Sequence, residues 1–192
     1  VPEESKVNFA TLFHNLVYDK GSFVVKMFFD LVGEESFYRI CSNFLNEFKN
    51  KSVEVNDFIS ISNSTLNKDF NPFFDPWLRN VGFPVLIVSE IEKNCQKVGI
   101  TISQICQNKC IFHFNISILY EKEGKLYKKK VEINDKFVHF DLNFDWIIIN
   151  DDLSSLCFVI YSKNLLKSLK KADQESKINK LNKLIIRESV KI

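Results

Sequence analysis

The sequence predicts an α+β protein in which helices come first, an antiparallel β-sandwich follows, and helical structure returns near the end. Three observations predict this order. Apolar residues recur at helical spacing as far as about residue 80. After that they alternate with polar residues, which is the two-residue period of half-buried strands. From Ser162 onward the spacing is helical once more. We therefore expect a helical part over residues 1–82, a sandwich over 83–150, and the last sandwich strand with the start of a second helical part over 151–192.

The first two predicted helices are separated by a single glycine. The first starts at Ser22, and its apolar stripe consists of Phe23, Val24, Met27, Phe28, Leu31 and Val32. Gly33 stands where a helix C-terminal cap is expected. The second helix starts at Glu34 and Glu35, whose carboxylates suit the positive end of the helix dipole. Residues 49–51 end it.

Two shorter helices are predicted before residue 82. Asn56 is the expected N-cap of the first of them, because its side chain can accept a hydrogen bond from the first turn. The other is expected to start at Asp75 and Pro76, since proline is tolerated in a first turn.

Six strands are predicted after the Gly82-Phe83-Pro84 segment, where the periodicity changes. Residues 122–124, Lys-Glu-Gly, supply a hairpin turn between the second and third of them. The expected strands cover residues 98–102, 112–120, 126–133, 138–142, 146–149 and 156–161.

Composition excludes several classes of protein. The 26 Lys and Arg residues against 24 Asp and Glu residues give a net charge of +2, so the chain lacks the basic excess of a nucleic-acid-binding domain. No apolar run approaches the 18 or more residues of a transmembrane helix. The five cysteines are odd in number and irregularly spaced, which favours a reducing, cytoplasmic location and leaves a disulfide as the open alternative.

The sequence lacks the short motifs that commonly mark a metal site or a catalytic nucleophile. The best metal-binding candidates are Cys106, Cys110 and His113, with Cys95 nearby, but their spacing matches no standard zinc pattern. Cysteine is more often a small buried apolar residue in such a place. There is no Gly-x-Ser-x-Gly elbow. The lysines at residues 128–130 could form an anion patch, but we interpret them as solvated charge on a strand.

Two groups of residues do form recognisable motifs. Residues 17–27, VYDKGSFVVKM, followed by residues 31–37, LVGEESF, resemble the segment downstream of the zinc site in zinc aminopeptidases of the aminopeptidase N type. Residues 13–16, FHNL, are similar to the lead-in of that segment. Residues 75–85, DPWLRNVGFPV, resemble the exit from the catalytic domain, and residues 98–104 resemble the strand that follows. The order and the change from helix to strand both match.

The sequence departs from the family pattern at three places. Asn80 stands where the family has Gln, residues 105–106 replace a basic pair, and Phe158-Val159 replaces a Tyr-Arg pair. In the family these positions take no direct part in catalysis.

The resemblance implies a fold and an incomplete active site. The chain would be the end of a thermolysin-like catalytic domain, then the sandwich, then the start of a C-terminal helical domain. The family's zinc ligands, its general base and its amine-binding loop would precede Val1, so this chain is expected to hold no catalytic zinc by itself and to be inactive alone. The substrates would be peptides.

Tyr18 is the one active-site residue that the resemblance carries over. In the family this phenol donates a hydrogen bond to the negatively charged oxygen that forms during peptide hydrolysis. Asp19 and Lys20 are interpreted as first-turn charges and a local ion pair, and Gly21 as a position of close backbone approach. Trp77 and Phe83 are expected to pack between the helical part and the sandwich.

Two other functions remain open. The chain could belong to a non-catalytic scaffold, as in a transcription-initiation subunit with an inactive aminopeptidase-like body, or it could be a degenerate remnant that acts as an interaction module. The intact Tyr-Asp-Lys-Gly motif at residues 18–21 favours the enzyme.

Overall fold

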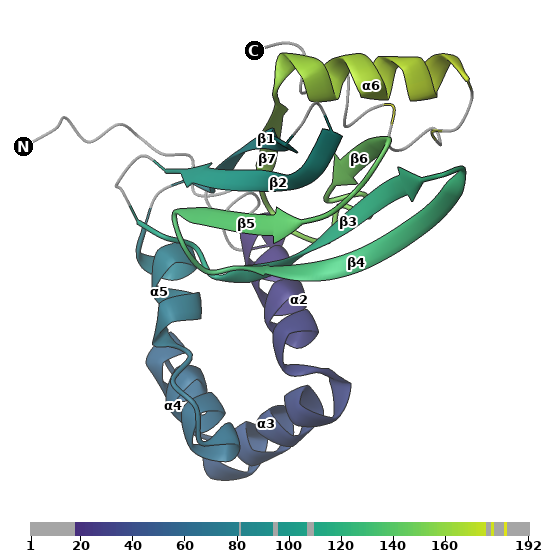
Figure 1. Cartoon of the computed structure of the whole chain (residues 1–192). Coiled ribbons are helices and arrows are strands. Elements are labelled where there is room, and N and C mark those ends of the chain that lie inside the picture. Colours follow the sequence, from purple (N-terminus) through teal and green to yellow (C-terminus); the bar gives the residue numbers. More distant parts are fainter. Residues whose placement is uncertain are drawn as a thin grey trace, which may run out of the picture.

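The computed structural model describes residues 18–80, 82–93, 96–106 and 110–175, together with residues 178 and 183. Helices α2–α5 lie on one side of two β-sheets, and α6 lies on the other side (Figure 1). This α+β arrangement, in the order helix, strand, helix, confirms the predicted fold class. The helices are α2 (Gly21–Val32), α3 (Glu34–Glu47), α4 (Val55–Leu66), α5 (Asn71–Arg79) and α6 (Lys163–Gln174).

The boundary between α2 and α3 is where the sequence places it. Gly33 has φ +82°, a left-handed backbone conformation that favours glycine, and its N–H donates to the Phe29 carbonyl at 2.9 Å. Glu34 and Glu35 occupy the first turn of α3. The side chains of Val24, Met27 and Phe28 form the buried face of α2.

The starts of α4 and α5 differ from the prediction. Helix α4 begins after Glu54, whose backbone N–H donates to Asp57 Oδ2 at 2.8 Å. Asn56 therefore lies inside the helix, where its Oδ1 accepts from Arg79 at 3.1 Å. Helix α5 begins four residues earlier than expected, because Pro72 already provides the proline that suits a first turn, and Pro76 lies inside the helix.

In the described part of the chain, seven strands form two sheets. One has the order β5-β2-β1-β7 and the other has the order β4-β3-β6. All neighbours are antiparallel except β1 and β7, which run parallel. Strand β1 was not among the six strands that periodicity singled out. The strands are β1 (Val85–Lys93), β2 (Gln96–Ile105), β3 (Phe114–Lys122), β4 (Lys125–Ile133), β5 (Phe137–Asp141), β6 (Trp146–Ile149) and β7 (Phe158–Tyr161).

One hydrophobic core cluster takes side chains from the helices and from both sheets. Phe28 of α2 lies among the rings of Phe70, Phe73 and Phe74, with centroid distances of 5.2, 5.5 and 4.7 Å. None of the helices within the described ranges is long and apolar enough to cross a bilayer. The helical pattern predicted beyond residue 175 lies almost entirely outside the described residues.

Candidate functional site

Tyr18 lies in a π-helical turn over residues 18–20 that leads directly into α2. Its side chain is 59% exposed. π-helical turns are rare, and they occur frequently at functional sites. The phenol is therefore accessible to a ligand rather than buried in the core.

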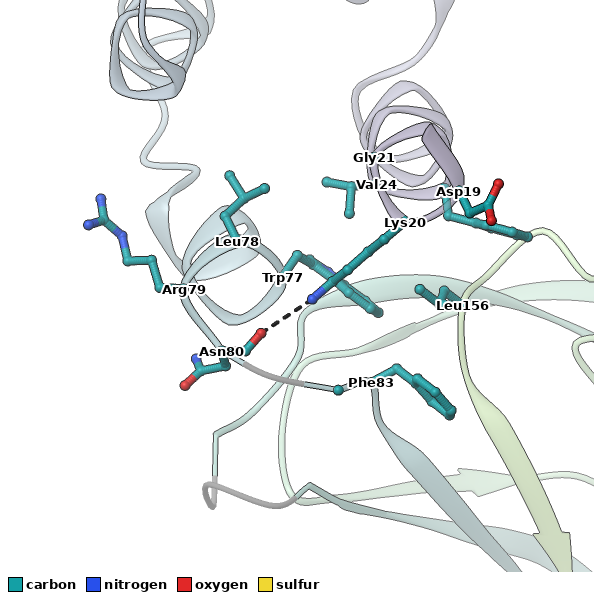
Figure 2. Close-up of a pocket in the computed structure, with 12 residues that line it drawn as sticks. Asp19, Lys20, Gly21, Val24, Trp77, Leu78, Arg79, Asn80, Phe83 and Leu156 are labelled. Carbon is teal, nitrogen blue, oxygen red and sulfur yellow. Dashed lines mark hydrogen bonds between the residues drawn. The ribbon is translucent and has the colours of Figure 1, made fainter. Parts of the chain in front are cut away.

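A cavity of about 660 Å³ lies next to this turn, between the start of α2 and the end of α5 (Figure 2). The β6–β7 connection contributes Leu156 to its wall. The residues that line it are Asp19, Lys20, Gly21, Phe23, Val24, Trp77, Leu78, Arg79, Asn80, Gly82, Phe83 and Leu156. Two segments about sixty residues apart in sequence thus form one site, and both belong to the motifs that the sequence singled out.

Lys20 connects these two segments. Its Nζ donates to the backbone carbonyl of Asn80 at 3.2 Å, across the cavity (Figure 2). Burial lowers the pKa of Lys20 below its usual value, while the nearby Cys110 thiol acts in the opposite direction. The predicted local ion pair with Asp19 is therefore replaced by a long-range bond that fixes the end of α5.

Gly21 does not have the role that the sequence predicted. A Cβ added at this position would meet no heavy atom within 4 Å. Within the part of the chain that the structure describes, no backbone approaches it closely, and Gly21 is one of the residues that line the cavity.

Trp77 packs as expected, whereas Phe83 does not. The Trp77 ring lies 4.4 Å from the Phe112 ring and 5.8 Å from the Phe114 ring, so α5 is joined to the sandwich there. Its indole Nε1 is buried and has no hydrogen-bond partner among the described residues. Phe83 is 47% exposed and lines the cavity, so the prediction that it packs at the interface is wrong.

The described residues do not fit a zinc site. They contain no group of three or more His, Cys, Asp or Glu side chains that could hold a metal ion. Cys106 Sγ donates to the carbonyl of Cys110 at 2.8 Å, and both cysteines are free thiols. His14 and Cys95 lie outside the described residues.

Two of the three lysines at residues 128–130, Lys128 and Lys130, form ion pairs, which corrects the prediction that these lysines are only solvated charge. Lys128 Nζ lies 2.9 Å from Asp151 Oδ2 and 3.1 Å from Asp152 Oδ2. Lys130 Nζ lies 3.8 Å from Asp30 of α2. These pairs attach β4 to the turn after β6 and to the helical part.

Sequence reasoning missed two features of this site. Leu156 reaches the cavity from a distant connection, and no local pattern indicates that. The Lys20–Asn80 bond was missed because neither residue shows its partner in the sequence. The sequence indicated a connection only in that Lys20 and Asn80 each lie in one of the segments that resemble the family.

Comparisons with known proteins show what this chain is similar to. Residues 2–77 match the model of the Peptidase family M1 domain. The chain is 27% identical over 177 residues to the alanine/arginine aminopeptidase of Saccharomyces cerevisiae, a match that covers 89% of this chain and 20% of that protein. It is 24% identical to aminopeptidase 2 of Candida albicans, covering 93% of this chain and 20% of that protein. The chain thus spans about a fifth of the length of these relatives.

Among solved structures, the chain is similar to the crystal structure of Legionella pneumophila aminopeptidase A in complex with aspartic acid. The TM-score is 0.68 at 17% identity, and the match covers 89% of this chain and 23% of that one. At this identity the likeness shows the fold alone.

Proposed function

Since this chain belongs to the M1 aminopeptidase family, we propose that it forms part of a zinc aminopeptidase that removes residues from the N-termini of peptides. Support comes from the placement of the Tyr-Asp-Lys-Gly motif. Its tyrosine is exposed at the start of α2, and its lysine ties that start to the second matching segment.

In this proposal Tyr18 stabilises the tetrahedral intermediate of peptide hydrolysis. Attack of water on the peptide carbonyl produces a negatively charged oxygen, and the phenolic O–H donates a hydrogen bond to it. The contribution is made in the transition state, so it affects kcat more than substrate binding.

The test is Tyr18→Phe in the complete protein that carries this chain. Loss of one such donor typically lowers kcat by about 10²–10³-fold. Tyr38 of α3 is the matched control, because its side chain is 60% exposed and it lies outside the motif. We expect Tyr38→Phe to retain full activity. An unchanged kcat in Tyr18→Phe would remove Tyr18 from the mechanism, whereas a complete protein without any peptidase activity would favour the scaffold.

We further propose that residues outside this 192-residue chain bind the zinc that the family implies, and that peptides are the substrates. Zinc would supply a polarised water and a positive charge next to the reacting carbonyl. The 192-residue chain alone is then inactive. Elemental analysis of the purified chain is expected to find no stoichiometric zinc. A stoichiometric metal together with peptide hydrolysis by this chain would contradict the proposal.

A further inference from the structure

Two neighbouring thiols lie between β2 and β3, and the proposed peptidase reaction does not use them. Cys106 directly follows β2, and three residues separate it from Cys110 in the sequence. Both cysteines are free and partly exposed. Cys106 Sγ donates to the Cys110 carbonyl at 2.8 Å, and the two side chains are also hydrogen-bonded to each other. The two sulfur atoms are therefore neighbours in the folded chain.

A pair of reciprocal hydrogen bonds holds the chain on both sides of these thiols. Gln104 Nε2 donates to the Phe112 carbonyl at 3.1 Å, and Gln104 Oε1 accepts from the Phe112 N–H at 3.0 Å. Cys106 lies two residues after Gln104, and Cys110 lies two residues before Phe112. The side chain of Phe112 is fully buried, which anchors this pair of bonds in the core. The fold therefore keeps the two thiols together, in addition to their closeness in sequence.

A cavity gives small molecules access to the pair. Its volume is about 460 Å³, within the usual range of roughly 300–1,000 Å³ for small-molecule sites. Cys106 and Cys110 both line it, together with side chains that include Ile111, Lys136 and Phe137. A reagent that enters this cavity meets both cysteines. The pair thus combines closeness of the two sulfurs with access from solvent, which are the two requirements for thiol–disulfide exchange.

We propose that Cys106 and Cys110 form a modification site, at which a small-molecule disulfide such as glutathione disulfide oxidises the two thiols to an intramolecular disulfide. The cysteine count left a disulfide open without indicating a pair, and the geometry selects this one. The reaction breaks no peptide bond and needs neither zinc nor Tyr18. It therefore goes beyond the proposed function, and its test is independent of peptidase activity.

The order of the two steps follows from the environment of Cys110. Burial, and next the hydrogen bond with the Cys106 side chain, raise the pKa of Cys110 to about 11, so Cys110 is protonated at neutral pH. Cys106, as the thiolate, attacks one sulfur of glutathione disulfide, which forms a mixed disulfide and releases one glutathione. Cys110 then loses its proton to water and attacks the Cys106 sulfur, which releases the second glutathione. The two electrons and two protons that the dithiol gives up end on two molecules of glutathione.

Tryptic peptide mapping tests the pairing directly. The 192-residue chain is incubated with mixtures of oxidised and reduced glutathione, its remaining thiols are blocked with N-ethylmaleimide, and it is digested with trypsin. Cleavage after Lys109 places Cys106 in the peptide 98–109 and Cys110 in the peptide 110–122, while Cys95 falls in the peptide 94–97. We expect mass spectrometry to find the peptides 98–109 and 110–122 joined, two hydrogen atoms lighter than their sum, and separated again by reduction.

Substitutions identify the partners. In Cys110→Ser, the peptide 98–109 is expected to carry one glutathione, because the second step has lost its nucleophile. Cys95→Ser is the matched control and should leave the joined peptides unchanged. Cys41 of α3, a partly exposed thiol, is the internal control and is expected to carry glutathione only as a mixed disulfide. Joined peptides that contain Cys95, or glutathione on Cys41 without any link between Cys106 and Cys110, would overturn the proposal.

A comparison with the unfolded chain separates the effect of the fold from closeness in sequence. If the fold holds the thiols together, their effective concentration is higher than in a flexible chain, and we expect the disulfide to form at a glutathione ratio about tenfold less oxidising in the folded chain than in concentrated urea. The fraction of joined peptides at each ratio measures this. A disulfide that is equally or more stable in urea would show that the fold does not position the pair, and the assignment would fail.

Discussion

Gln104 shows how much one buried polar side chain can hold together. Its Nε2 donates to the carbonyls of Phe112 at 3.1 Å and Asp135 at 2.8 Å, and its Oε1 accepts from the Phe112 N–H at 3.0 Å. These bonds join the end of β2 to the segment before β3 and to the turn before β5. Gln104 ends the segment 98–104 that resembles the family, but the sequence could not predict its three bonds, because its partners are backbone groups that any residue type provides.

Gln104→Leu is expected to destabilise the protein strongly. The apolar side chain has a similar size, but it leaves three backbone groups without their partner, so we expect a loss of about 3 kcal/mol in the free energy of unfolding. Urea denaturation measures this. Gln174→Leu at the end of α6 is the control and should change the stability by less than about 0.5 kcal/mol. Equal effects of the two substitutions would contradict this role of Gln104.

Asp152 makes stability depend on pH. Burial opposes its charge, but hydrogen bonds from Ser117, Ser154 and Lys128 outweigh burial and hold the pKa of Asp152 well below its ordinary value of 3.8. The folded state therefore binds this proton less readily than the unfolded chain does. The stabilisation is fully present above about pH 4 and is lost as the pH falls through the folded-state pKa.

Asp152→Asn is expected to reduce the fall in unfolding free energy between pH 5 and pH 2, because the variant has no carboxylate there to protonate. The measurement is urea denaturation across this range. Asp141→Asn, which changes an exposed carboxylate of β5, is the control and should leave the pH dependence as it is. A wild-type slope in Asp152→Asn would show that other carboxylates produce the acid sensitivity.

At the scale of the elements, the sequence predicted helix ends that depend on local backbone chemistry. It did not predict features that depend on a hydrogen-bond partner or on a neighbouring strand. Gly33 ends α2 because its backbone must adopt a positive φ, and that requirement is visible in the sequence. The predicted start of α4 was wrong because Asn56 is a residue type that favours an N-cap, whereas the N-cap is Glu54. The observed bond from the Glu54 N–H to Asp57, at the third helical position, fixes this earlier start. Strand β1 lies between β2 and β7. The spacing of its own apolar residues does not indicate these two neighbours.

The capping of α4 leads to a prediction about single substitutions. Asp57→Ala removes the acceptor of the Glu54 N–H and a carboxylate from the first turn, so we expect a loss of about 1 kcal/mol in the free energy of unfolding. Asn56→Ala, the residue that sequence alone favoured, should cost less, because its one side-chain contact is an exposed bond from Arg79. Thermal unfolding of the two variants compares them. A larger loss in Asn56→Ala would restore the original assignment of the cap.

At the scale of the whole molecule, the helical part and the sandwich are connected by apolar and charged contacts. Trp77 of α5 lies against Phe112 and Phe114, and Lys130 of β4 lies near Asp30 of α2. The buried side chains of both parts form one cluster. Motif order predicted that these parts follow each other. It could not predict how they pack, since that depends on contacts between residues far apart in sequence.

A continuous core predicts that the helices and the sheets unfold together, even though we propose that they correspond to separate domains in the family. In Trp77→Phe, fluorescence reports on Trp146 within the sandwich, while circular dichroism at a helical wavelength reports mainly on α2–α5. Two-state unfolding requires that both probes give the same urea midpoint. Trp146→Phe provides the reciprocal experiment, with Trp77 at the interface as the reporter. Separate midpoints in both variants would mean that the contacts made by Trp77 and Lys130 are too weak to couple the two parts, and that each part is stable on its own.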